Sequence, residues 1–278
     1  MNHCIKNLEN ISRTIRKEML EMCISAGKGH VTSSLSCVDI MVALYYGGIL
    51  KTDKHNPKWD ERDRFILSKG QASPALYTIL ADIGFFDKQE LKKFAQLNGK
   101  IAVHLQNDVP GVEITAGSLG QGYALAAGMA LGLKMDRKLS LVYALLGDGE
   151  CYEGSIWEAA MFIAHNKLNN LITIIDRNYL CVTDFTENLV ELEPFGEKWV
   201  AFGFNVIRIN GHDIESIVGE LEKLKSRPQR KPTVIIADTV KGYGVESLCY
   251  DPLWHGCAPT AENAAQCINE LLKGHINE

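Results

Sequence analysis

Runs of apolar residues alternate along the chain with stretches in which apolar residues recur every three or four positions. Four runs have the length of a strand, at residues 141–146, 171–175, 205–209 and 233–237, and a shorter run lies at 64–67. Strands that are apolar on both faces and separated by helices are typical of a parallel sheet with right-handed crossovers. The pattern therefore predicts an α/β fold, mainly a parallel sheet flanked by helices.

The periodic stretches predict the helices that cover this sheet. They are expected at residues 8–27, 36–46, 76–83, 88–97, 156–167, 198–202 and 214–225. Asp87 is the expected N-cap of the fourth helix. In the fifth, Trp157, Met161 and Phe162 form a helical stripe that we assign to the core. No Pro- or Gly-rich linker divides the chain, so residues 1–278 are predicted to be one domain, with a looser tail over roughly 245–278.

Composition and charge exclude several classes of protein. The chain has 278 residues, a net charge of −5 and no long basic run, which excludes nucleic acid and anionic membranes as expected partners. The longest apolar run, residues 123–133, is shorter than the ~20 residues of a membrane span. The eight cysteines include no C-x-x-C pair and the N-terminus lacks a signal-peptide core, so we expect a soluble cytoplasmic protein with reduced thiols.

Polar residues follow two of the predicted strands. Gly147-Asp148-Gly149 comes directly after one strand, and Asp176-Arg177-Asn178 ends the next. The interval between them holds one crossover helix, so the two tips become neighbours at the carboxyl edge of the sheet. Asp and Asn oxygens with a loop carbonyl form the ligand set that Mg²⁺ prefers beside a diphosphate. The alternative is that both tripeptides are simple strand-ending turns.

A glycine-rich loop, residues 117–122, opens a further predicted helix crowded with small residues. Its backbone N–H groups would be available to an anion. Close packing of this helix on the sheet is the alternative explanation of the glycines.

Five motifs in register give the sequence a family resemblance. They are Ser25-Ala-Gly-Lys-Gly-His30, residues 60–69, Gly117-Ser-Leu-Gly-Gln-Gly122, Gly147-Asp-Gly149 with Asn178, and Trp254-His-Gly256. In this order the chain resembles the thiamine diphosphate binding half of transketolases from about residue 8 to residue 260. It is similar to the separate N-terminal subunit found where transketolase is split over two polypeptides.

The resemblance implies roles for individual residues. The implied Mg²⁺ ligands are Asp148, Asn178 and the backbone carbonyl of Leu180. The implied cofactor contacts are Ser33, Lys69, Gln71, Gly117, Ser118, Leu119, Gly149, Asn178, Lys241 and His255. The implied catalytic residues are His30, His104 and His255, which line the substrate channel, and Glu153, which links the two cofactor sites of the assembled enzyme.

The residues alone leave plainer interpretations open. His30 and His255 stand beside glycines in loop-like sequence, where a solvated histidine is the default. His104, between two apolar residues, reads equally as a half-buried histidine with satisfied hydrogen bonds. His165 and His212 receive no role.

Gln71 departs from the family pattern, which has a histidine at this position. Glutamine can still donate and accept a hydrogen bond, but it cannot carry a proton near neutral pH. The substitution therefore indicates a slower reaction on ordinary ketose phosphates, a changed substrate, or a neutral replacement of a hydrogen-bonding anchor.

The resemblance implies transfer of a two-carbon ketol unit from a ketose phosphate to an aldose, as in the pentose phosphate pathway. A second, pyrimidine-binding subunit supplies the missing Glu, so the chain alone is expected to be inactive and its assembly α₂β₂. The alternatives are a related transferase of a specialised sugar or secondary-metabolite pathway, and a catalytically silent regulatory paralogue.

Overall fold

The computed structural model describes residues 2–226 and 230–273. Five strands form one parallel sheet in the order β1-β2-β3-β7-β6. They are β1 (Arg64–Leu67), β2 (Val142–Gly147), β3 (Leu171–Arg177), β6 (Asn205–Asn210) and β7 (Thr233–Asp238). Each lies on a run predicted as a strand, so the expected α/β fold with a mainly parallel sheet is confirmed.

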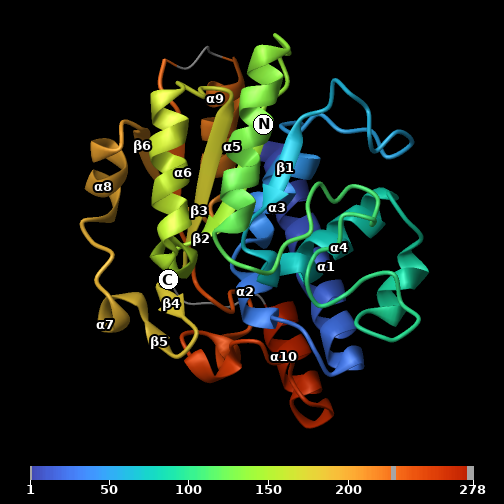
Figure 1. Ribbon diagram of the computed structural model, residues 1–278. Coiled ribbons are helices and arrows are strands. Elements are labelled where there is room, and N and C mark those ends of the chain that lie inside the picture. The colour runs from blue at the N-terminus through green and yellow to red at the C-terminus, as the bar shows by residue number, and fades with distance from the viewer. Residues whose placement is uncertain (1, 227–229, 274–278) are drawn as a thin grey trace.

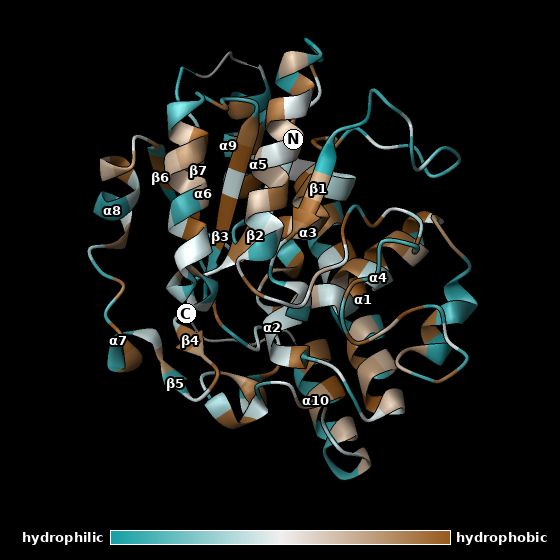
Figure 2. Cartoon of the chain, viewed as in Figure 1, coloured by the Kyte–Doolittle hydropathy of each residue, from teal (hydrophilic) through white to brown (hydrophobic). Residues whose placement is uncertain are grey.

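Successive residues of the central strands pack into two separate cores. Tyr143 and Leu145 of β2 belong to one apolar cluster, and Val142, Ala144 and Leu146 belong to the other. Both faces of the sheet are therefore covered, which explains why β2 and β3 read as near-continuous apolar runs and why β3 is mostly brown in Figure 2.

Helices form the two outer layers. The first core is covered by α1 (Asn2–Ala26), α3 (Val38–Tyr46), α4 (Ser73–Ile83) and α9 (Ile214–Ser226). The second is covered by α5 (Gln121–Met135), α6 (Gly154–His165) and α8 (Phe195–Ala201). Figure 1 shows α5 and α6 in front of the sheet, with the blue helices on its far side.

Short elements gather at the carboxyl ends of the strands, toward the bottom of Figure 1. They are α2 (Val31–Leu35), η1 (Gly70–Ala72), η3 (Gly149–Tyr152), β4 (Leu180–Cys181), β5 (Asp184–Phe185), α7 (Thr186–Leu189) and η5 (Pro252–Trp254). β4 and β5 pair antiparallel, with Leu180 opposite Phe185.

Two helix predictions need correction. In place of the helix expected at 88–97, residues 88–93 form the 3₁₀ helix η2 (Lys88–Lys93), which Asp87 caps as expected by accepting the Gln89 N–H. The backbone leaves the helical path at Phe94, with ψ 130, and folds back so that a Cβ on Gly99 would lie 2.0 Å from the Lys93 carbonyl oxygen. The helix expected at 36–46 corresponds to α3, which begins two residues later at Val38, and the short helix α2 (Val31–Leu35) precedes it.

The assignment of Met161 and Phe162 to the core is wrong, because their side chains are 54% and 43% exposed. Helix α6 instead buries the stripe Ile156, Ala159, Ala160 and Ile163 against the sheet. Its spacing is that of one helix face, and the expected stripe lies beside it. Trp157 is partly buried and packs against Trp199 and Phe202.

The segment from residue 245 onward contains η4 (Glu246–Leu248), η5 and α10 (Ala261–Lys273), and Cys267 and Leu271 of α10 are buried. Residues 274–278 of the expected looser tail lie outside the described residues. In the described part of the chain, no helix is both long and apolar enough to span a membrane.

Candidate cofactor site

A cavity of about 110 Å³ lies where the carboxyl ends of β2 and β3 meet the loops after β1 and β7. Ten of the residues implied by the resemblance line it: Ser33, Lys69, Gln71, Leu119, Asp148, Gly149, Asn178, Leu180, Lys241 and His255. They come from segments spread over more than 200 positions of the chain. The parallel sheet gathers them because every strand ends at the same edge.

The three candidate metal ligands lie close together in this cavity. Asp148 is 1% exposed and accepts hydrogen bonds from the Gly149 N–H at 2.8 Å and the Tyr179 N–H at 2.6 Å. The side-chain oxygen of Asn178 accepts the Leu180 N–H at 3.2 Å. A carboxylate, an amide oxygen and a backbone carbonyl are therefore presented by two adjacent loops.

Asp148 also has a cationic partner. The Arg177 guanidinium, fully buried, donates to its Oδ2 at 3.2 Å and to Thr186 Oγ1 at 2.7 Å. Arg177 donates further to Glu187 at 2.7 Å and Glu193 at 3.3 Å. The guanidinium therefore ties Asp148 to the segment 186–193 that follows the β4–β5 hairpin.

Lys69 is held by a buried carboxylate behind the cavity. Its ammonium donates to Asp176 Oδ2 and, at 3.0 Å, to the carbonyl oxygen of Ser33. Asp176 also accepts from Ser36 Oγ at 2.6 Å and from Thr239 Oγ1. Burial opposes ionisation of Asp176, but Lys69 and these hydroxyl donors lower its pKa below the ordinary value. The Lys69 side chain is thus fixed in the cavity wall.

Lys241 contributes a second cation. Its ammonium lies 3.3 Å from the carbonyl oxygen of Leu180 and 3.1 Å from Nδ1 of His255. Burial and repulsion from Lys69 lower the pKa of Lys241 to about 8. An anionic group entering the cavity would meet both ammonium groups.

The site carries balanced charge before any ligand is considered. The buried carboxylates in or directly behind the cavity are Asp148, Glu150 and Asp176, and the buried cations are Lys69, Arg177 and Lys241.

Three histidines meet at the mouth of the site. The ring of His30 lies 5.3 Å from that of His104 and 5.5 Å from that of His255, centre to centre. Burial lowers the pKa of His30 to about 4, with a contribution from His104, and lowers that of His255 to about 4, with a contribution from Lys241. Both rings are therefore neutral near pH 7 and can accept or donate hydrogen bonds to hydroxyl groups.

The glycine-rich loop lies against the cavity through close backbone contacts. Gln71 Nε2 donates to the carbonyl oxygen of Gly117 at 3.4 Å. A Cβ on Gly70 would come within 2.8 Å of the Gly117 nitrogen, and one on Gly117 within 3.2 Å of the His104 ring. Glycine is therefore required by space at position 70, while a side chain at position 117 would need a small shift of the His104 ring. Gln71 Oε1 is buried and has no hydrogen-bond partner in the described structure.

Five of the predicted residues are not in the cavity wall. His30, His104 and Gly117 lie beside it, next to His255 and Gln71. Glu153 is exposed at the start of α6, and Ser118 is exposed on the loop before α5.

Sequence reasoning missed the contributions of Glu150, Asp176 and Arg177. Glu150 and Arg177 could have been found from the sequence, because each is a charged residue next to an assigned site residue, Gly149 or Asn178. Each also comes shortly after an apolar run that predicts a buried strand.

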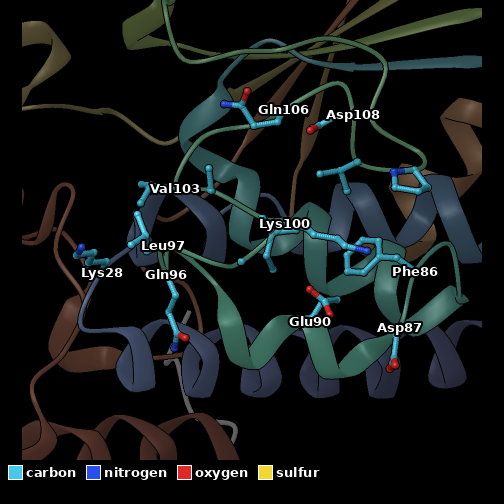
Figure 3. A pocket seen from close by; sticks show the side chains of 16 residues that line it. Lys28, Phe86, Asp87, Glu90, Gln96, Leu97, Lys100, Val103, Gln106 and Asp108 are labelled. Atoms are coloured by element: carbon cyan, nitrogen blue, oxygen red, sulfur yellow. The ribbon is translucent and has the colours of Figure 1, made fainter.

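A much larger cavity, of about 1170 Å³, lies between η2 and residues 95–110. Figure 3 shows Lys100 reaching toward Phe86 across this space, with Glu90 and Asp87 on the η2 side. It contains none of the residues implied as cofactor contacts. In the described residues there is also no group of three or more His, Cys, Asp or Glu side chains that could hold a metal. The candidate oxygen ligands include a single carboxylate, so a metal there would depend on amide and backbone oxygens.

This geometry defines a class of protein: an α/β domain with a cavity lined by charged side chains at the carboxyl edge of its parallel sheet. Residues 8–272 match the family model described as transketolase, thiamine diphosphate binding domain. The chain therefore belongs to the transketolase family.

Individual relatives place the chain more closely. It is 42% identical to a 6-deoxy-6-sulfo-D-fructose transketolase subunit of Clostridium sp. (strain MSTE9), over 96% of this chain and 97% of that subunit. It is 37% identical to an apulose-4-phosphate transketolase subunit of Phocaeicola vulgatus, over 96% and 94% of the two chains.

Human transketolase is 34% identical over 96% of this chain, which spans 42% of that protein. The transketolase structure from Campylobacter jejuni matches with a TM-score of 0.89 and 34% identity, over 96% of this chain and 43% of that one. The prediction of a transferase of the transketolase family, of the N-terminal type in a split enzyme, is confirmed.

Proposed function

We propose that this chain binds thiamine diphosphate with Mg²⁺ in the cavity and transfers a two-carbon ketol unit from an anionic ketose to an aldose, together with a second subunit. One observation carries the proposal: three oxygen ligands and two ammonium groups converge in one cavity beside three histidines. When bound, thiamine diphosphate supplies the nucleophilic carbon of this reaction.

The residues present fit the metal and the diphosphate. Asp148, Asn178 Oδ1 and the Leu180 carbonyl are oxygen donors of the kind Mg²⁺ takes alongside phosphate oxygens. The Leu180 carbonyl oxygen is directed at a positive charge in the structure itself, because it accepts a hydrogen bond from the Lys241 ammonium. Lys69 and Lys241 would donate hydrogen bonds to the diphosphate, while Ser33 and the glycine-rich loop would bind it through backbone and hydroxyl groups.

The histidines are suited to handling substrate hydroxyl groups. His30, His104 and His255 form a continuous cluster beside the cavity. The neutral rings of His30 and His255, whose pKa values are lowered, can orient a hydroxyl and take up its proton as the reaction proceeds. Glu153, exposed at the α6 start, is proposed to act across an interface between subunits, since it does not reach the cavity of its own chain.

Exposed apolar side chains support an assembly. Leu125 of α5 and Met161 and Phe162 of α6 are 47%, 54% and 43% exposed on neighbouring helices. Val182, at the edge of the cavity, is 52% exposed. Apolar surface of this kind marks protein contacts. We propose an α₂β₂ complex in which a partner covers the mouth of the site and supplies the missing catalytic Glu.

The free thiols of all eight cysteines agree with a cytoplasmic location.

The metal assignment is tested by Asp148→Asn. Calorimetry with thiamine diphosphate at saturating Mg²⁺ is expected to show at least a ~10-fold loss of affinity. Asp136→Asn, on an exposed residue at the end of α5, is the matched control. Equal affinity in the two variants would refute the metal site. No binding by the unaltered chain, either alone or with the pyrimidine-binding subunit, would refute the cofactor and favour a silent paralogue.

The need for a partner is tested by purifying the chain alone and with a co-expressed pyrimidine-binding subunit. Ketol transfer is expected for the complex, and light scattering is expected to give two copies of each chain. Activity of the chain without any partner would contradict this part of the proposal.

A second candidate function differs in the donor. Two relatives are named for 6-deoxy-6-sulfo-D-fructose and for apulose 4-phosphate, and Gln71 replaces the expected histidine here. The donor of this enzyme would then be a modified anionic ketose in a specialised sugar pathway. Assays with xylulose 5-phosphate and 6-deoxy-6-sulfo-D-fructose as parallel donors distinguish this candidate from the pentose phosphate pathway.

A further inference from the structure

One buried carboxylate, that of Glu150, contacts three of the loops that form the cofactor cavity. Glu150 follows Gly149 in η3 and is 2% exposed. Its Oε1 accepts from Ser68 Oγ at 2.5 Å and from the Gly120 N–H at 2.9 Å. Its Oε2 accepts from the Gly147 N–H at 3.1 Å. These three donors come from the loop after β1, the glycine-rich loop and the end of β2.

Each donor is the immediate neighbour of a residue in the cavity wall. Ser68 precedes Lys69, and Gly147 precedes Asp148. Gly120 follows Leu119, and the Glu150 side chain itself reaches the cavity wall. A shift of the Glu150 carboxylate would therefore move Lys69, Asp148 and the glycine-rich loop together.

The position of the glycine-rich loop depends on the hydrogen bond from the Gly120 N–H to Glu150, because the loop has no space to move toward α6. Gly120 begins α5 with φ +82, and no side chain caps the helix there. A Cβ on Gly120 would lie 2.2 Å from Ser155 Oγ and 2.9 Å from Glu153 Cβ, so the loop already packs tightly against the start of α6. At its other end the loop is held by Gln71 at the Gly117 carbonyl. Glu150 and Gln71 thus fix the two ends of the loop.

We propose that Glu150 is a positioning residue for the cofactor diphosphate, which holds Lys69, Leu119 and Asp148 in the arrangement that binds it. The inference rests on the proposed function, since it needs a diphosphate in the cavity. Glu150 acts through its three donors and takes no part in proton transfer.

The informative variant is Glu150→Gln, which keeps the shape of the side chain. A glutamine offers one acceptor oxygen where Glu150 has two, and its amide N–H₂ would then face the donor of at least one loop. A buried donor left without an acceptor is costly, so the loops are expected to shift. Ser68→Ala removes a single contact, and Glu222→Gln, exposed on α9, is the matched control.

Calorimetry with thiamine diphosphate at saturating Mg²⁺ measures the effect. The dissociation constant is expected to rise about 10-fold in Glu150→Gln and about 3-fold in Ser68→Ala, and to stay within about 2-fold in Glu222→Gln. Hydrogen exchange of the cofactor-free chain gives an independent readout, with faster exchange expected at Gly120 and Gly147 in Glu150→Gln.

The outcomes separate the two levels of the proposal. If the unaltered chain binds the cofactor neither alone nor together with the pyrimidine-binding subunit, the proposed function fails. If it binds and Glu150→Gln loses thermal stability with unchanged affinity, the role is structural and the inference is overturned. If Glu150→Gln does not fold, Ser68→Ala decides: an affinity equal to that of Glu222→Gln overturns the inference, and a weaker one supports it.

Discussion

The ammonium of Lys241 lies 3.1 Å from Nδ1 of His255. Because it also contacts the Leu180 carbonyl, one side chain joins the proposed diphosphate site to the histidine cluster. A change at Lys241 is therefore expected to affect both the proposed diphosphate site and the ring of His255.

Lys241→Gln is expected to raise the dissociation constant of thiamine diphosphate by at least ~10-fold, because one of two ammonium groups in the cavity is lost. It should also raise the pKa of His255, since Lys241 is one of the charges that lower it. Calorimetry and NMR titration of the His255 ring check the two effects. Lys92→Gln, on an exposed lysine of η2, is the control, and unchanged values for Lys241→Gln would contradict both roles.

Gln71→His tests the departure from the family pattern. Gln71 lines the cavity and its Oε1 has no hydrogen-bond partner, so an imidazole ring at position 71 would also face the cavity. In the reconstituted two-chain enzyme, the rate with xylulose 5-phosphate is expected to rise by roughly 10²-fold or more as a titratable group is restored. An unchanged rate in an enzyme that is already fully active would show that Gln71 is a neutral replacement.

His30 is expected to make the cofactor-free chain less stable in mild acid. Its pKa is about 4 in the folded chain and near 6.5 when unfolded, so the unfolded state binds more protons between these values. The free energy of unfolding should therefore fall as the pH drops from about 6.5 to about 4. Urea denaturation at pH 7 and pH 5 measures this loss, and the loss should be smaller in His30→Gln. The same loss in both proteins would exclude His30 as its source.

Arg177→Met compares a buried ion pair with an exposed one. It leaves the Asp148 carboxylate buried without its cation, which costs about 3–5 kcal/mol of unfolding free energy. Arg208→Met removes the exposed pair with Asp238, whose side chains are 46% and 33% exposed, and should cost about 1 kcal/mol or less. Denaturant unfolding of both variants checks the contrast. Similar losses would show that Arg177 contributes little through its charge.

The strands and most site residues could be predicted because their signals are local. Apolar runs fix the strands, and the residues that follow them must share one edge of a parallel sheet. The burial of α6 could not be read from Met161 and Phe162, because two apolar stripes overlap on that helix and the sheet selects one. His212, left without a role, is held by Asp39 and by the Val240 N–H, partners 173 and 28 residues away.

Glu150 illustrates a further limit. In sequence it is one more acidic residue beside a glycine, and its three donors lie at positions 68, 120 and 147. Such a contact exists only once the loops after two strands and before one helix have been brought together. The hydrogen-bond partners of the Glu150 carboxylate are therefore set by tertiary packing and cannot be inferred from the neighbouring sequence.

The balance of three buried carboxylates against three buried cations has a thermodynamic consequence. The cavity has no surplus positive charge with which to hold a bare diphosphate, so the ligand must bring its own counter-ion. Metal and organic cofactor should then show reciprocal linkage, each raising the affinity of the other by the same factor. A chelator would release both at once, and the apoprotein would discriminate between the free anion and its metal complex.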